Sequence, residues 1–194
     1  MTFFDGNISS LYQRLDDSCV YHVAGTAFVI EEKREGAEAV IEIKSKLNAF
    51  HVKGDQNAFP ILRNKKCADY LVFFYDNTKG KWYLHIFEFT KSVDNTSWEE
   101  KIVRQFDGGL LNAYAIGGVL KVPEFEEITM HCGYRRDRNM ASLVNMKAPL
   151  GRPAHNSWTA ETTVELPSFP GLKYAKNLIR LNPENGEGPT LELP

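Results

Sequence analysis

Two apolar stretches joined by a turn-forming segment are the most constraining feature of the chain. The segment CADYLVFFYDNTKGKWYLHIFEFTKS contains one apolar and aromatic run from Ala68 to Tyr75 and another from Trp82 to Thr90. Between them, DNTKGK supplies the Asp, Asn and Gly residues that favour tight turns. The sequence therefore predicts a β-hairpin, and each of its strands carries one acid, Asp69 or Glu88.

These two acids need a partner if the hairpin has a buried face, because an unpaired carboxylate in a protein interior is costly. Asp69 lies near the start of the first strand and Glu88 near the end of the second. Antiparallel pairing therefore predicts that they lie side by side at one end of the hairpin. The alternative is that they are solvated edge residues, or that they form ion pairs with Lys65, Lys66 or Lys91.

A divalent metal is the partner that best suits two adjacent carboxylates. Mg²⁺ takes hard oxygen ligands from one or two carboxylates and leaves its other positions to water and phosphate. A metal held in this way can activate a water and neutralise the charge that develops on a phosphodiester. Lys91, three residues after Glu88, could orient the water or stabilise the oxyanion.

A long helix is predicted directly after the hairpin. Thr96 and Glu99 have the spacing of a capping box, and apolar residues follow at helical spacing at Trp98, Ile102, Phe106, Leu110 and Ala113. The glycine pair at 117–118 is a natural terminator. The pair at 108–109 lies inside the helix, where each glycine costs about 1 kcal/mol relative to alanine. Such a cost indicates a close approach of another segment to the backbone at this point.

The remaining elements set the fold class. NISSLYQRLDD has the spacing of a short helix, whereas CVYHVAGTAFVIEEK, AEAVIEIKSKLNAFHV, FEEITMHCGY and WTAETTVEL have strand character, and LKYAKNLIRL could be a short helix or a strand. This order predicts an α/β (α+β) protein with a mixed central sheet flanked by helices. We expect one domain over residues 1–182, and PENGEGPTLELP, residues 183–194, as a flexible tail.

Charge and composition narrow the classes of protein. The formal net charge of −2 provides no global basic field, so any contact with nucleic acid must be local. The three cysteines include no CxxC pair and the five histidines no HxxxH or HExxH motif, which argues against a zinc site. With no apolar window of about 18 residues and no basic, apolar leader, the sequence predicts a cytoplasmic protein without membrane contact.

The hairpin and the following helix resemble the PD-(D/E)xK nuclease superfamily, which has the restriction-endonuclease-like fold. In that superfamily an acid starts one strand, an E-x-K lies on the next strand, and the following helix often carries Gln. Here CADYLVFFYDN would supply Asp69, HIFEFTKS would supply Glu88, and EEKIVRQFDGGL would supply Gln105. The resemblance covers residues 66–118.

This resemblance implies a function. Asp69 and Glu88 would hold Mg²⁺ or Mn²⁺, Lys91 would position the attacking water, and Gln105 would support the site or contact phosphate. The implied activity is metal-dependent hydrolysis of phosphodiester bonds in nucleic acid, with DNA as the expected substrate. Many enzymes of this superfamily act as dimers, so a homodimer is one assembly that the resemblance implies.

The E-x-K motif departs from the superfamily pattern. A lysine is required at position 90, where this chain has Thr90, and Lys91 follows one residue later. Adjacent side chains on a regular strand face opposite ways. Either the strand bulges after Glu88 and Lys91 serves, or Thr90 occupies the lysine position and the site is weakened or inactive. In the second case the protein would act as a nucleic-acid-binding or protein-assembly module.

Two further groups of charged residues are candidates for a functional site. Glu42 and Lys44 form an E-x-K at regular strand spacing, although a half-exposed strand with outward polar residues explains them better. Arg135, Arg136 and Arg138 in YRRDRN could hold phosphates near the site, and solvated surface charge explains them equally well.

A third hypothesis for the function is an unrelated α+β ligand-binding domain. It predicts a hairpin register that keeps Asp69 and Glu88 apart.

Overall fold

The structure, a computed structural model, describes residues 20–23, 27–35, 38–54, 66–93, 96–122, 124–137 and 165–194. A six-stranded sheet with the order β1-β4-β5-β6-β7-β8 forms its centre. Its strands are β1 (Val20–Val23), β4 (Asn48–Lys53), β5 (Tyr70–Asp76), β6 (Lys81–Val93), β7 (Phe125–Asp137) and β8 (Ala175–Arg180). The smaller sheet, with the order β2-β3-β9, contains β2 (Ala27–Glu32), β3 (Ala39–Lys44) and β9 (Leu191–Glu192). The helix α2 (Thr96–Leu120) connects β6 to β7.

Both sheets are mixed. In the large sheet, β1, β4, β5 and β6 pair antiparallel in turn, whereas β6, β7 and β8 pair in parallel. In the small sheet, β2 and β3 are antiparallel and β9 joins β3 in parallel. The parallel step from β6 to β7 requires a crossover, which α2 provides. The predicted α+β class with a mixed central sheet is therefore confirmed.

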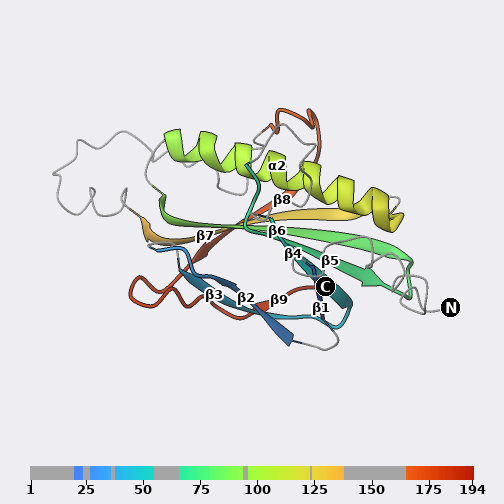
Figure 1. The fold of residues 1–194 in the computed structure, drawn as a ribbon, viewed down its shortest axis with the longest axis horizontal. Coiled ribbons are helices and arrows are strands. Elements are labelled where there is room, and N and C mark those ends of the chain that lie inside the picture. The colour runs from blue at the N-terminus through green and yellow to red at the C-terminus, as the bar shows by residue number, and fades with distance from the viewer. Residues whose placement is uncertain are drawn as a thin grey trace, which may run out of the picture.

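The two faces of the large sheet are covered differently. Figure 1 shows α2 along one face and the small sheet on the other. One buried cluster joins the large sheet to α2 and includes Leu84, Ile86, Ile102, Phe106 and Leu110. A second cluster joins it to the small sheet and includes Ile30, Ile41, Val72, Phe74 and Phe87. Within the described residues the second face is thus covered by strands, where the sequence predicted helices on both sides.

The predicted hairpin is confirmed as β5 and β6. Its register pairs Tyr70 with Phe87 and Asp76 with Lys81. The turn is closed by the Asp76 carboxylate, which accepts hydrogen bonds from the backbone N–H of Thr78 at 2.9 Å and from its hydroxyl at 2.6 Å. Gly80 has a positive φ of 67°, a conformation that glycine adopts without strain.

The helix begins at Thr96 and runs further than the sequence predicted. It passes through the glycine pair at 117–118 and ends at Leu120, and Lys121 then adopts a left-handed φ of 58°. The backbone N–H of Val122 closes this end by donating to the carbonyl of Gly117. Ile116 and Leu120 are buried against the large sheet. Burial of two such side chains offsets the roughly 1 kcal/mol that each glycine costs.

The C-terminal segment differs from the flexible tail predicted for residues 183–194. It lies against the small sheet, where the backbone of Val40 donates to the Gly186 carbonyl and accepts from the N–H of Gly188. The strand β9 then pairs Ile43 with Leu191. The polar, glycine-rich composition of this segment gave no indication of the short strand β9, because its partner β3 lies far away in the sequence.

Some of the remaining predicted helices and strands lie within the described residues, and others lie outside them. AEAVIEIKSKLNAFHV forms two strands, β3 and β4, and LKYAKNLIRL contains the strand β8. The expected N-terminal helix, most of WTAETTVEL and the polar loop after residue 137 lie outside the described residues. Among the residues that the structure describes, no helix is long and apolar enough to cross a membrane.

Candidate active site

Asp69 is held at the entry to β5 by tight backbone packing. The preceding residue, Ala68, is fully buried. A Cβ on Gly109 of α2 would lie 3.1 Å from the Ala68 Cβ and 3.2 Å from a methyl group of Ile86, and a Cβ on Gly54 would collide with the Ala68 carbonyl. The close approach predicted at the glycine pair of the helix is therefore confirmed at Gly109, and it places the Asp69 end of the hairpin against α2.

The Asp69 carboxylate is fixed to the neighbouring strand. The Oδ2 atom of Asp69 accepts a hydrogen bond of 2.7 Å from the backbone N–H of Phe89. The backbone carbonyl of Asp69 accepts a hydrogen bond of 2.9 Å from the N–H of Gly54. The side chain is only 4% exposed. The hydrogen bond from the Phe89 N–H fixes the orientation of this carboxylate.

Glu88 lies on the face of β6 that α2 covers. It is two residues after Ile86, which belongs to the helix-side cluster, so the alternation of the strand directs both side chains to that face. Glu88 is fully buried, and its Oε1 accepts a hydrogen bond of 2.5 Å from Nε2 of Gln105. The register that pairs Tyr70 with Phe87 sets Asp69 beside Glu88. The structure thus brings together Asp69, Glu88 and Gln105.

Burial dominates the electrostatics of this group. Burial first, and the negative charge of Asp69 second, raise the pKa of Glu88 well above its ordinary value of 4.5, against opposing effects of Arg34, Lys101 and the Gln105 hydrogen bond. Glu88 therefore holds its proton to a higher pH than an exposed glutamate does. This behaviour is typical of functional sites, where buried acids are kept close to one another.

Two buried oxygen atoms at the site have no hydrogen-bond partner among the described residues. They are Oε2 of Glu88 and Oε1 of Gln105. When Glu88 is ionised both atoms are acceptors, and a proton on Oε2 would provide the missing donor. A divalent cation would satisfy the same oxygens, and carboxylate and amide oxygens are the hard ligands that Mg²⁺ takes. The donor set therefore fits such an ion, although no cluster of three or more His, Cys, Asp or Glu ligands occurs in the described part of the chain.

Two cysteine thiols lie near the acids. Burial raises the pKa of Cys67 to about 12, and the charges of Glu88 and Asp69 act in the same direction. Cys132 is opposite Glu88 in the register of β6 and β7, and burial raises its pKa well above the ordinary value. Both therefore remain neutral thiols.

Thr90, not Lys91, lies on the face of Glu88. The strands β6 and β7 keep one register from Tyr83 to Thr90 and again at Ser92 and Val93, and their one register shift falls between Trp82 and Tyr83. With no bulge after Glu88, strand alternation places Thr90 on the same face as Glu88 and Lys91 on the opposite face. Thr90 is buried, and Lys91 is exposed. The site therefore carries a hydroxyl where an E-x-K motif carries an ammonium group.

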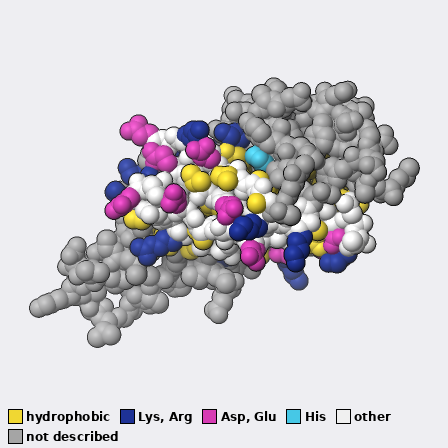
Figure 2. Space-filling view, turned by 90° about the horizontal axis from the view of Figure 1, so that it is seen from below, with side chains coloured by type: hydrophobic (Ala, Val, Ile, Leu, Met, Phe, Trp, Pro, Cys, Tyr) yellow, Lys and Arg dark blue, Asp and Glu magenta, His cyan; other side chains and the backbone are white. Residues whose placement is uncertain are grey.

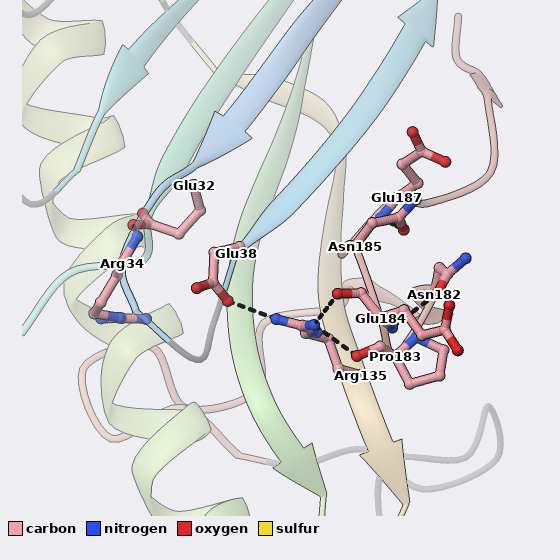
Figure 3. A network of polar contacts seen from close by, with 9 residues as sticks. All are labelled: Glu32, Arg34, Glu38, Arg135, Asn182, Pro183, Glu184, Asn185 and Glu187. Atoms are coloured by element: carbon pink, nitrogen blue, oxygen red, sulfur yellow. Dashed lines mark hydrogen bonds and ion pairs between the residues drawn. The ribbon is translucent and has the colours of Figure 1, made fainter.

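The three predicted phosphate-binding arginines have different environments. Arg135 donates to Oε2 of Glu38 at 2.5 Å and to the carbonyls of Pro183 and Glu184 at 2.6 and 2.9 Å. Figure 3 shows this network, which ties β7 to the start of β3 and to the C-terminal segment. The Arg135 guanidinium thus connects β7 to Glu38 and to the C-terminal segment. Arg136 is exposed, and Arg138 lies outside the described residues.

The rival E-x-K pair lies on the outer face of the small sheet. Ile41 and Ile43 point into the core, and between them Glu42 is half exposed and accepts a hydrogen bond of 2.7 Å from the Thr190 hydroxyl. Lys44 lies 4.0 Å from the same carboxylate. Figure 2, which views the molecule from this side, shows acidic and basic side chains interspersed. The interpretation as outward polar residues on a half-exposed strand is confirmed.

A buried histidine pair was not predicted from the sequence. Nδ1 of His85 lies 2.9 Å from Nε2 of His131, and the His131 ring stacks on Phe87 at a centroid distance of 4.3 Å. Burial lowers the pKa of His85 to about 4 and that of His131 well below its ordinary value. Because β6 and β7 pair in parallel only through the crossover helix, no local spacing could have indicated the contact.

Comparisons with known proteins identify no relative. No family model matches the chain, and no curated protein or solved structure gives a significant match. The functional interpretation therefore rests on the arrangement of the residues at the hairpin end.

Proposed function

We propose that this chain is a metal-dependent phosphodiesterase of the PD-(D/E)xK nuclease type that hydrolyses nucleic acid, with DNA as the expected substrate. The observation that carries the proposal is the convergence of Asp69, Glu88 and Gln105 at one buried end of the hairpin. The element order supports it, because an acid precedes one strand, a glutamate lies on the next, and a crossover helix supplies the glutamine.

Each residue of this group would have a distinct role. Asp69 and Glu88 would hold Mg²⁺ or Mn²⁺, which when bound lowers the pKa of a coordinated water and offsets negative charge on phosphate. The Phe89 N–H orients the Asp69 carboxylate, and the Gln105 amide orients that of Glu88. The helix face packed around Phe106 excludes water from the rear of the site.

The test is cleavage of plasmid and of single-stranded DNA in the presence of Mn²⁺. We expect the wild type to cleave and Asp69→Ala and Glu88→Ala to lose activity while retaining their far-ultraviolet circular dichroism. Glu42→Gln, which alters the rival E-x-K pair, serves as the matched control and should cleave like the wild type. Loss of activity in Glu42→Gln alone would move the site to the small sheet and refute the proposal.

Thr90 favours a second function. Because no lysine lies at the E-x-K position on the face of Glu88, the alternative is a catalytically inactive protein of the same fold. Such a protein would act as a nucleic-acid-binding or protein-assembly module. That function predicts neither cleavage nor Mn²⁺ binding by the wild type. Binding of Mn²⁺ through both acids would exclude it.

A further inference from the structure

One arginine reaches β6 at Phe89, beside the two acids. Arg34 lies in the turn between β2 and β3, far from the hairpin in the sequence. Its Nη2 donates a hydrogen bond of 3.1 Å to the carbonyl of Phe89 and lies 3.9 Å from Oδ1 of Asp69. Phe89 is thus held at its N–H by Asp69 and at its carbonyl by Arg34.

The turn that carries Arg34 is itself fixed. The backbone N–H of Arg34 donates a hydrogen bond of 2.7 Å to Oε1 of Glu32, and Figure 3 shows the two residues side by side. The Tyr70 hydroxyl anchors the preceding strand by donating to the carbonyl of Glu31 at 2.6 Å. These contacts connect the small sheet to the start of β5 and hold Arg34 close to the acids.

The guanidinium of Arg34 retains capacity for another ligand. Its side chain is 51% exposed, and its contacts within the described residues engage Nη2 alone. An arginine has five N–H donors in a planar fork that matches the oxygens of a phosphate group. The separation of 3.9 Å from Asp69 is at the long end of an ion pair, so this contact leaves the fork available.

On the Glu88 face of β6, the position of the E-x-K lysine carries no positive charge, and Arg34 could supply one. Thr90 lies on the Glu88 face, and Lys91 lies on the other face of the strand. The positive charges that act on Glu88 are those of Arg34 and Lys101. Lys101 is exposed on α2, one helical turn before Gln105, and no ion pair or hydrogen bond joins it to either acid among the described residues. Among the residues that the structure describes, Arg34 thus combines positive charge with direct contact to the site.

From this geometry we propose that Arg34 binds a phosphate group of the nucleic-acid strand beside Asp69 and Glu88, in the role that a strand lysine would otherwise fill. The inference rests on the proposed function, because it deepens the same site by naming the residue that holds the substrate.

Oligonucleotide binding without metal tests the contact independently of cleavage. The probe is a fluorescein-labelled single-stranded DNA of about 16 nucleotides, followed by fluorescence anisotropy in EDTA between about 50 and 200 mM NaCl. The variants are Arg34→Gln, Arg34→Lys and Lys101→Gln. Lys33→Gln is the matched control, since Lys33 is in the same turn, is 78% exposed and pairs with Glu31 at 3.1 Å.

We expect Arg34→Gln to weaken binding about tenfold and to reduce the slope of log K against log salt by about 0.7, the value for one phosphate contact on a single strand. Arg34→Lys should restore the slope, because it retains the charge, and Lys33→Gln should resemble the wild type. A salt slope that Arg34→Gln leaves unchanged would overturn the inference, as would a loss found in Lys101→Gln in place of Arg34→Gln. Failure of the wild type to bind the probe would overturn it as well.

Cleavage with Mn²⁺ separates this inference from the proposed function. If the nuclease assignment is wrong and the phosphate contact is right, no variant cleaves and binding still depends on Arg34. If the assignment is right and the contact is wrong, Arg34→Gln cleaves as fast as Lys33→Gln. If both are right, Arg34→Gln loses cleavage by about a hundredfold or more, while its far-ultraviolet circular dichroism shows that it remains folded.

Discussion

Replacement of Glu88 by glutamine should stabilise the protein at neutral pH, although it alters a buried residue. Glutamine keeps the oxygen that accepts the hydrogen bond from Nε2 of Gln105. It also places an N–H group where Oε2 of Glu88 has no partner, and Oε1 of Gln105 can accept from it. The substitution thus replaces an acid that must either hold a proton or bury a charge with a neutral side chain that always supplies the donor.

The magnitude follows from the raised pKa of Glu88 in the folded state. Between the ordinary value of 4.5 in the unfolded chain and the higher folded value, the folded state binds more protons. The free energy of unfolding of the wild type therefore falls as pH rises through this window, by up to about 1.4 kcal/mol per pH unit. The advantage of Glu88→Gln should grow with pH and become constant above the folded pKa.

Urea denaturation of both proteins between about pH 5 and pH 8 measures this difference. Titrating groups that do not interact with Glu88, including the buried histidines, contribute equally to both proteins and cancel in the comparison. Glu100→Gln, an exposed acid of α2, is the control and should run parallel to the wild type. If Glu88→Gln also runs parallel to the wild type, Glu88 is not a destabilised buried acid and the reasoning fails.

Three further predictions concern packing, the C-terminal segment and the histidines. Gly109→Val should destabilise the fold by about 1–3 kcal/mol in urea denaturation, because a Cβ at Gly109 already meets neighbours at 3.1 and 3.2 Å. Gly118→Ala should stabilise the fold by up to about 1 kcal/mol in the same measurement, because a Cβ at Gly118 meets open space. Arg135→Met should cost about 1–2 kcal/mol and speed proteolysis of the C-terminal segment, and exposed Arg136→Met should change stability by less than about 0.5 kcal/mol. His85 should titrate near pH 4 in an NMR experiment, so its burial costs stability as pH falls from 6.5 towards 4; titration near 6.5 would contradict the buried pair.

The hairpin and the helix could be predicted because their signals are local. Turn residues at 76–80 and apolar runs on either side specify β5 and β6 without reference to the rest of the chain. The cost of glycine inside a helix indicated the close contact that Gly109 makes with Ala68. Antiparallel pairing then placed Asp69 near Glu88, and helical spacing placed Gln105 within reach.

The features that escaped prediction depend on contacts between distant segments. The run EEKREG gives no sign that Arg34 reaches Phe89, because that contact joins residues 55 positions apart. The C-terminal segment reads as flexible from its composition, yet β3 offers an unpaired edge to which β9 adds. The unbroken register after Glu88 depends on β7, so the sequence could only pose the choice between Thr90 and Lys91.

Calorimetric titration of Mn²⁺ into the wild type, Asp69→Asn, Glu88→Gln and Glu42→Gln tests the central claim most directly. The claim that Asp69 and Glu88 together form a metal site predicts one binding event in the wild type and in Glu42→Gln, and its loss in the other two variants. Because Glu88 must release its proton on binding, the affinity of the wild type should also rise with pH. Absence of binding in the wild type, or binding that survives both Asp69→Asn and Glu88→Gln, would contradict the account.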